Sequence, residues 1–326
     1  MLTLDQLQRE AAATGFAAEA LEKVIRLLVL LEGLRSHPFL KTRLVLKGGT
    51  ALNLFVFDVP RLSVDIDLNY IGAADRETML AERPQFERAV EAVCSRLDLA
   101  VRRVPAEHAG GKWRLAYVAA SGRSGRLELD ANFLLRVPLW PPLRAASRCV
   151  GSFGAVDIPL LDLHELAAGK VVALLSRSAP RDLYDVRELL GHPGLDGQRL
   201  RVASVVYGGI GRRDWREVSL ADVHADPGAV DRTLLPLLRA DVVPRRDQLA
   251  EWTERLGRDC RELLRAIFPL GPDEIEFLRL LNERGEIRPE LLTDNESLRA
   301  AIRAQPGLKW KAQNVRAHRG RRASPS

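Results

Sequence analysis

The sequence predicts an α+β fold, in which a small mixed sheet with flanking helices is followed by a mainly helical C-terminal half. Three observations support this prediction. Apolar residues recur at helical spacing over residues 4–35. Short apolar segments alternate with turns between residues 41 and 134. Helical periodicity then returns from residue 162. This order of elements is typical of a sheet domain followed by a separate helical domain.

The order of the predicted elements also sets the domain limits. The predicted strands are 41–46, 62–70, 99–103, 113–119 and 127–134, and the predicted helices around them are 4–35, the segment that opens at Gly48, and 75–99. We therefore expect residues 1–160 to hold the sheet with its N-terminal helices. Residues 161–305 are expected to form a helical domain, and residues 306–326 a basic tail.

The composition indicates an intracellular globular protein. The chain has 326 residues, of which 46% are hydrophobic and 28% charged, and this length is enough for two domains. The apolar run from Val24 to Leu31 contains Arg26 and is too short to span a bilayer, so we expect no membrane segment. The N-terminus lacks the features of a secretory signal. Three widely spaced cysteines predict reduced thiols in the cytoplasm; they are Cys94, Cys149 and Cys260.

The net charge of +6 is concentrated at one end of the chain. Residues 306–326 contain six basic residues and no acid, so residues 1–305 balance to zero. We expect a tail of this composition to be disordered. It could contact nucleic acid phosphates, or it could be solvated without a specific role. The six residues are Lys309, Lys311, Arg316, Arg319, Arg321 and Arg322.

Two acids lie in the otherwise apolar strand predicted over residues 62–70. Asp65 and Asp67 are two residues apart, so their side chains leave the strand on the same face. Carboxylates this close raise each other's pKa unless a cation lies between them. Mg²⁺, with Mn²⁺ as an alternative, takes one or two carboxylate ligands and completes its shell with water and phosphate oxygens. The pair therefore predicts a divalent metal site.

Asp130 is the predicted third carboxylate. It lies in the segment RLELDANFLL, an apolar strand that could neighbour the first. Three carboxylates around two metals support in-line nucleotidyl transfer, because one metal lowers the pKa of the attacking hydroxyl and the other stabilises the leaving pyrophosphate. Asp130 would be a metal ligand or the general base nearest the acceptor. Glu128 lies on the same face by alternation and is the competing choice.

Gly48, Gly49 and Thr50 open a helix just before the strand that carries the two aspartates. Backbone N–H groups at a helix N-terminus bind anions, and glycine leaves them accessible. Thr50 adds a hydroxyl donor. Beside a metal site these residues predict a triphosphate site, whereas without the aspartates they would indicate a simple strand-to-helix turn.

Lys170 lies near the apolar face of a predicted helix, LAAGKVVALL, where a lysine needs an anionic partner. One candidate partner is a nucleotide phosphate. The other candidates are Asp182 and Asp185 in the segment PRDLYDV, which lie three residues apart on a helix and could fix Lys170 or Arg181 in place. The second possibility is a structural network of ion pairs between two helices.

Taken together, the segments KGGTALN, RLSVDIDLNY and RDLYDV, with a lysine-bearing helix before the last, resemble the nucleotidyltransferase AbiEii/AbiGii toxin family. This family includes the MenT-type toxins and belongs to the DNA polymerase β-like nucleotidyltransferase superfamily. The resemblance covers roughly residues 20–200. It implies a polymerase β-like nucleotidyltransferase core in residues 1–160 and a helical domain, 161–305, that contributes Lys170 and the RDLYD motif to the site. Residues 200–326 carry no motif of the family.

The resemblance also implies a role for each matching residue. The residues that match nucleotide-binding positions are Gly48, Gly49, Thr50, Arg61, Ser63, Lys170 and Asp185. The residues that match catalytic positions are Asp65, Asp67, Asp130, Lys170 and Asp182, and the first three of these are the implied metal ligands.

Known members of the family are cytoplasmic bacterial toxins paired with a cognate antitoxin, and some transfer nucleotides to the 3′ end of tRNA. The resemblance therefore implies a Mg²⁺-dependent enzyme that moves a nucleoside monophosphate from an NTP to tRNA. Two alternatives stay open. The acceptor could be a protein or a small molecule, or the chain could be a catalytically silent member that acts as a binding partner.

Overall fold

The computed structural model describes residues 2–104 and 110–323, which form two compact units. Unit 1 consists of the described residues of 1–136, 142–161 and 231–247. Unit 2 consists of those of 137–141, 162–230 and 248–326. The change of unit after residue 161 lies next to the predicted boundary at 160. Two segments depart from that prediction, because 137–141 belongs with the helical unit and 231–247 with the sheet unit.

Unit 1 is built on a seven-stranded mixed sheet with the strand order β3-β4-β5-β2-β1-β7-β6. The strands are β1 (Leu44–Lys47), β2 (Asp65–Tyr70), β3 (Ala100–Val104), β4 (Gly110–Val118), β5 (Ser124–Asn132), β6 (Leu143–Ala145) and β7 (Ile158–Leu160). The pairs β2/β5 and β1/β7 are parallel, and the other neighbours are antiparallel. This confirms the predicted mixed sheet. Strands β6 and β7 were not predicted, because three residues are too few to show alternation.

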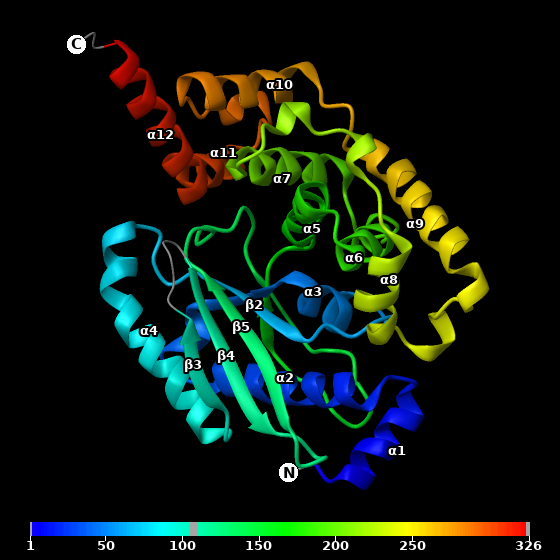
Figure 1. Cartoon of the computed structure of the whole chain (residues 1–326). Helices are drawn as coiled ribbons and strands as arrows, with labels where there is room; N and C mark the ends of the chain where they lie inside the picture. The colour runs from blue at the N-terminus through cyan, green and yellow to red at the C-terminus, as the bar shows by residue number, and fades with distance from the viewer. Residues whose placement is uncertain (1, 105–109, 324–326) are drawn as a thin grey trace. The chain divides into compact units, whose positions relative to one another are not determined.

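One face of this sheet is apolar and packs against helices α2 (Ala18–Ser36) and α4 (Arg76–Arg96), which Figure 1 shows beside the strands; α1 (Leu4–Thr14) precedes α2. Phe86 of α4 is fully buried, with its ring centroid 6.0 Å from that of Tyr70 on β2 and 6.1 Å from that of Trp113 on β4. The Arg26 guanidinium of α2 lies 4.2 Å from the centroid of the Tyr117 ring. Burial of these side chains from water is the main force that holds the helices to the sheet. We call this side the helix face.

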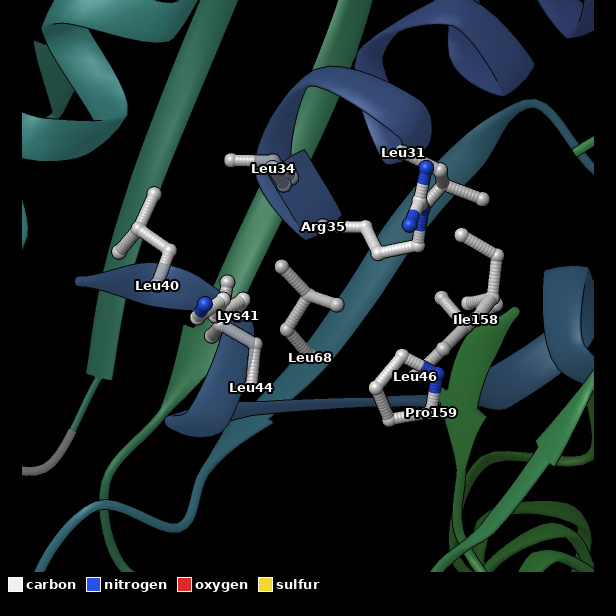
Figure 2. A pocket seen from close by; sticks show the side chains of 10 residues that line it. All are labelled: Leu31, Leu34, Arg35, Leu40, Lys41, Leu44, Leu46, Leu68, Ile158 and Pro159. Atoms are coloured by element: carbon white, nitrogen blue, oxygen red, sulfur yellow. The ribbon is translucent and has the colours of Figure 1, made fainter. Parts of the chain in front are cut away.

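A small apolar cavity lies on the helix face (Figure 2). It is lined by Leu31, Leu34, Arg35, Leu40, Lys41, Leu44, Leu46, Leu68, Ile158 and Pro159. Leu46 and Leu68 are direct partners across β1 and β2, so both point into this side of the sheet. Asp65 and Asp67 alternate with the buried residues of β2 and therefore leave the sheet on its other side. The cavity is part of the hydrophobic core and is separate from the carboxylates.

The opposite side of the sheet carries polar and charged side chains, and we call it the carboxylate face. On β4 and β5 the residues that alternate with the buried core are half-buried or exposed. They include Lys112, Arg114, Glu128 and Asp130. Two neighbouring strands, β2 and β5, therefore place acids on one surface.

Unit 1 is completed by a late segment, residues 231–247, which contains the second part of α8 (Pro227–Thr233) and short 3-10 turns. Its backbone bonds to the loop before β2. The N–H of Leu62 donates to the carbonyl of Leu237 at 2.8 Å, and Arg61 forms an isolated bridge with Leu238. The loop that leads into the aspartate strand is thus held by residues about 175 positions further along the chain.

Unit 2 is helical, as the sequence predicted. Its longer helices are α5 (Leu163–Arg177), α6 (Pro180–Leu190), α7 (Gly197–Ile210), α9 (Leu249–Leu263), α10 (Pro272–Arg279), α11 (Glu296–Ala304) and α12 (Pro306–Ala323). A π-helical segment, η9 (Leu280–Arg284), continues α10. Helix α5 packs against both α6 and α7, and its fully buried side chains include Val171 and Leu174. No helix of the described chain is both long enough and apolar enough to cross a membrane.

The expected disorder of residues 306–326 was wrong for the part that the structure describes. Residues 306–323 form α12, which packs against η9, α7 and α11 (Figure 1). Leu308 is fully buried and Ala312 is 1% exposed, so a narrow apolar stripe anchors a helix that is otherwise polar. The charge-based expectation missed this stripe because only two residues form it. Residues 324–326 lie outside the described chain.

A buried carboxylate joins three parts of unit 2. Glu165 on α5 is 1% exposed. It accepts hydrogen bonds from the N–H groups of Leu139 and Trp140 at 3.0 and 3.2 Å, and from the Tyr207 hydroxyl of α7 at 2.6 Å. Burial raises the pKa of Glu165 to about 7, although each of these hydrogen bonds lowers it. The carboxylate therefore fixes segment 137–141 to the helical unit.

Stability is expected to fall as pH rises through the titration of Glu165. Between the ordinary glutamate pKa of 4.5 and the raised pKa of about 7, the folded chain keeps a proton that the unfolded chain has lost. The free energy of unfolding from urea titrations should therefore decrease across this pH range. Glu165→Gln should lose this slope and cost about 1–3 kcal/mol, because one amide oxygen cannot replace the lost acceptors.

The control is the difference between the pH profiles of the wild type and Glu165→Gln, in which the contributions of the other titrating groups cancel. Parallel profiles for the wild type and Glu165→Gln would show that Glu165 titrates normally.

Candidate active site

The carboxylate face is organised by strand register. Lys47 on β1 pairs with Asp67 on β2, Asp67 pairs with Asp130 on β5, and Asp130 pairs with Lys112 on β4. Four neighbouring strands thus present a row of two acids flanked by two lysines. Neighbouring strands lie about 4.7–4.9 Å apart, so side chains at paired positions on one face are neighbours.

The two acids of this row repel each other. Burial raises the pKa of Asp130 above its ordinary value, and the Asp67 carboxylate raises it further. Lys47 and Lys112 act in the opposite direction, but they do not outweigh these effects. Asp130 is therefore a half-buried carboxylate whose negative charge is only partly compensated, which is the electrostatic state that a bound cation relieves.

Glu128 is in a different state from Asp130, although both lie on β5. Its carboxylate forms ion pairs with Lys112 at 3.0 Å and Arg114 at 3.4 Å. The hydrogen bond from Lys112 lowers the pKa of Glu128, and Arg114 adds to this effect. Glu128 also pairs in register with Asp65, one step along the strand from the Asp67–Asp130 pair. Of the two candidates for the third carboxylate, Asp130 is the one whose charge is not already balanced.

Gly48 makes room for the Asp67 carboxylate. Its φ is +74°, a left-handed conformation that side chains rarely adopt. A Cβ at this position would lie 2.2 Å from Oδ2 of Asp67. The chain therefore needs glycine here for two reasons, the backbone conformation and the close approach of the acid. Gly48 begins α3 (Gly48–Ala51), which continues as the π-helical segment η2 (Leu52–Val56).

Gly49 also lies close to two predicted site residues. A Cβ there would lie 2.8 Å from the Ser63 hydroxyl and 3.0 Å from Nη2 of Arg61. Arg61 is 2% exposed, and its Nη1 donates to the carbonyl of Leu62 at 2.8 Å. The structure thus brings Gly49, Arg61 and Ser63 together at the start of α3. The late segment 231–247 supports this arrangement from outside, through its contacts with the backbone of Arg61 and Leu62.

Thr50 has a structural contact that the sequence did not reveal. Its side chain is fully buried, and its hydroxyl donates to the backbone carbonyl of Asp65 at 2.5 Å. A hydroxyl has a single proton to donate, so in this structure Thr50 ties the first turn of α3 to β2. This hydrogen bond helps to position Asp65, and the contact of Thr50 with a nucleotide phosphate stays a prediction.

The second group of predicted residues lies in unit 2. The Lys170 Nζ on α5 forms ion pairs with Asp182 at 2.9 Å and Asp185 at 2.8 Å, both on α6. Arg177 donates to the other oxygen of Asp182 at 2.6 Å. Burial alone would raise the pKa of Asp182, but Lys170 and Arg177 outweigh it and leave the pKa below its ordinary value. The structural network that the sequence left open is therefore present, with two cations and two anions.

The structure thus places the predicted residues in two groups, each within one unit. Asp65, Asp67 and Asp130, with the loop around Gly48 and Gly49, belong to unit 1. Lys170, Asp182 and Asp185 belong to unit 2.

The sequence did not identify Lys47 or Lys112 as site residues. Lys47 directly precedes the two glycines, and this position in the sequence could have indicated that it lies near the site. The contribution of both lysines depends on strand register, which a local pattern does not define.

The donor set of unit 1 fits a hard divalent cation. Its oxygens come from carboxylates, and the absence of a Cβ at Gly48 leaves space for Asp67. Within residues 2–104 and 110–323, no group of three or more His, Cys, Asp or Glu side chains is arranged to hold a metal ion by itself. A cation here would therefore depend on oxygens from water and from the triphosphate, which is usual for Mg²⁺.

Comparisons with known proteins identify the family and the fold. Residues 29–313 match the family described as nucleotidyl transferase AbiEii toxin, type IV toxin–antitoxin system. The fold is similar to that of MenT4, a nucleotidyltransferase toxin from Mycobacterium tuberculosis H37Rv, with a TM-score of 0.58 and 20% sequence identity. That similarity covers 97% of this chain and 100% of the other. No curated protein matches the sequence.

The similarity to MenT4 confirms the predicted fold class. The family match shows that the chain is a nucleotidyltransferase. The chain belongs to the AbiEii nucleotidyltransferase toxin family, as its resemblance in sequence implied. Membership in a family of type IV toxin–antitoxin systems implies an NTP substrate and an antitoxin partner.

Gly48→Ala is expected to reduce nucleotidyl transfer about 100-fold, because the added Cβ displaces the Asp67 carboxylate by an ångström or more. Turnover can be followed by release of pyrophosphate. The matched control is Gly122→Ala. Gly122 has a φ of +78° but no atom within 4 Å of an added Cβ, so it tests backbone strain alone. Equal losses in both variants would show that the contact with Asp67 is unimportant.

Lys170→Met is expected to destabilise the chain by about 3–5 kcal/mol, because it leaves buried carboxylates without their cation. Chemical denaturation gives the free energy of unfolding. The double variant Lys170→Met with Asp185→Asn keeps the Arg177–Asp182 pair and should recover much of the loss. If Lys170→Met unfolds like the wild type, the network does not hold α5 to α6. A stable double variant without transferase activity would support the predicted contact of Lys170 with the nucleotide.

Proposed function

We propose that this chain transfers a nucleoside monophosphate from an NTP to the 3′ end of tRNA, with Mg²⁺ as its metal and the cytoplasm as its site of action. The observation that carries the proposal is the in-register pair of Asp67 and Asp130, with Asp65 on the same face and Gly48 packed against Asp67. This arrangement holds three carboxylates beside a glycine loop on a rigid sheet, as nucleotidyl transfer requires.

The reaction consists of one substitution at phosphorus. The terminal hydroxyl oxygen of the acceptor bonds to the α-phosphorus of the NTP, the bond from that phosphorus to the bridging oxygen breaks, and pyrophosphate leaves. Asp130 lies beside Asp67 and has a raised pKa, so it is suited to accept the proton of the attacking hydroxyl. Mg²⁺ held by Asp65 and Asp67 would neutralise phosphate charge and lower the pKa of that hydroxyl.

Other residues of unit 1 would orient the nucleotide. Lys47 and Lys112 lie at the two ends of the row of acids and add positive charge near the triphosphate. The backbone at Gly48 and Gly49 is the proposed phosphate contact, with Arg61 and Ser63 packed against Gly49. Lys170, Asp182 and Asp185 remain predicted participants on the basis of the family resemblance, and their ion pairs give Lys170 a fixed position in unit 2.

Asp130→Asn is expected to lower nucleotidyl transfer by about 10²–10⁴-fold, because the amide cannot accept the hydroxyl proton. Glu128→Gln, two residues away on the same strand, should stay within a few-fold of the wild type, because the half-buried Glu128 is already paired with Lys112 and Arg114. The assay supplies each α-labelled NTP in turn with Mg²⁺ and total tRNA. A larger loss of activity for Glu128→Gln than for Asp130→Asn would show that Glu128, and not Asp130, is the third carboxylate.

The same assay tests the acceptor. Label on tRNA for the wild type, and none for Asp65→Ala, supports the proposal. Label on protein or on a small molecule, with none on RNA, would show that the acceptor is not tRNA. NTP binding without transfer to any acceptor would favour a silent binding protein. Chelation of divalent metal should abolish transfer, and Mg²⁺ or Mn²⁺ should restore it.

A further inference from the structure

Helix α12 has an exposed face that nucleotide transfer on the carboxylate face does not use. Its exposed side chains include Lys309, Trp310, Gln313, Asn314 and Arg316, and we call this set the α12 face. The helix has no acidic residue from Pro306 to Ala323, and the sequence adds Arg321 and Arg322 near its end. Lys311 is excluded because it is half-buried and donates to the carbonyl of Gly211 at 3.0 Å.

Trp310 is the most unusual member of this face. Its side chain is 56% exposed, and it is the one aromatic residue among the exposed large apolar side chains of the described chain. The helix does not need it for packing, because Leu308 and Ala312 form the buried stripe. Exposure of the large apolar surface of a tryptophan to water is unfavourable. An aromatic ring flanked by cations is suited to stack on a nucleic acid base.

Helical spacing arranges the other residues around Trp310. Gln313 and Asn314 lie three and four positions further along, so they are its neighbours on the surface. Lys309 and Arg316 are seven positions apart and line one edge of the same face. Amide groups can hydrogen-bond to base edges, and cations along an edge can follow a phosphate backbone. The α12 face thus combines stacking, base contact and phosphate contact.

A groove beside the face adds further positive charge. It is lined by Arg279, Asn282, Glu283, Arg284, Asn314, Val315, His318 and Arg319, from α10, η9 and α12. Its single acid, Glu283, is already neutralised by Arg216 at 2.8 Å and Arg279 at 3.5 Å. The remaining positive charge of the groove therefore favours an anionic ligand.

We propose that the α12 face and this groove bind single-stranded RNA, with a base stacked on Trp310 and phosphates on Lys309, Arg316 and Arg319. The inference rests on the proposed function, because it locates a binding surface for the proposed class of acceptor. An acidic protein surface is the competing partner. Trp310 is a lone apolar side chain among amides and cations, whereas the centre of a protein interface needs a larger apolar patch.

The test measures binding of a fluorescein-labelled single-stranded oligoribonucleotide to the full chain by anisotropy, in chelator and without NTP. Trp310→Ala should weaken binding about 5–100-fold, and Trp310→Phe, which keeps an aromatic ring, should stay near the wild type. Lys309→Glu with Arg316→Glu should weaken binding further and reduce its dependence on salt. Asp65→Ala should bind like the wild type, because binding does not need the carboxylate face.

Two controls match these changes on other surfaces. Arg123→Glu with Arg126→Glu makes the same charge change on exposed residues of unit 1, and Ile275→Ala removes an apolar side chain that is 44% exposed. Both should leave RNA binding unchanged. The proposal is overturned if the α12 variants bind RNA like the wild type. It is also overturned if they lose only an acidic protein partner.

The outcome separates this proposal from the proposed function. If the wild type labels tRNA while the α12 variants bind and label it equally well, the enzyme is as proposed but the α12 face is not its RNA surface. If the variants lose RNA binding and no label reaches RNA in the wild type, the α12 face binds RNA but the acceptor of the reaction is another molecule.

Discussion

Asp67 and Asp130 oppose each other across two parallel strands, and the arrangement of unit 1 follows from this unfavourable pair. Two carboxylates held this close raise the free energy of the folded chain, so other interactions must fix the strand register. The helix face does so, because a slip of one residue would turn Asp67 into the apolar core beside Leu46 and Leu68. Gly48 is required for the same reason, since only glycine leaves space for the Asp67 carboxylate.

The two units treat buried charge in opposite ways. In unit 2, Lys170 and Arg177 offset Asp182 and Asp185, so the network is balanced and well suited to join two helices. In unit 1, the pKa of Asp130 stays raised although two lysines flank the row of acids. A balanced network can be explained by stability alone. The raised pKa of Asp130, which burial and Asp67 cause, has no such explanation in stability.

Local patterns predicted much of this structure, and non-local contacts account for the rest. Alternation along one strand was sufficient to place Asp65 and Asp67 on one face, and helical periodicity located α2, α5 and α6. The choice between Asp130 and Glu128 depended on the ion pair that Lys112 of β4 forms with Glu128, and local sequence does not specify such a contact between strands. The same is true of Lys47 and Lys112. The hydrogen bond from the Thr50 hydroxyl to the carbonyl of Asp65 also joins two different elements, so a local pattern could not predict it. The disorder predicted for the tail came from its charge alone. The buried stripe of α12 consists of only two residues, which is too few to show a helical pattern.

The late segment of unit 1 has a consequence for how the protein is made. Arg61 and Leu62 lead into the aspartate strand, and their backbone partners lie at Leu237 and Leu238. A ribosome builds the chain from its N-terminus, so the sheet emerges long before these partners do. The loop that leads into the aspartate strand cannot reach its final form until residues 162–230 of unit 2 have been synthesised. A chain that ends before Leu237 would therefore lack the backbone partners that hold Arg61 and Leu62 next to the aspartate strand.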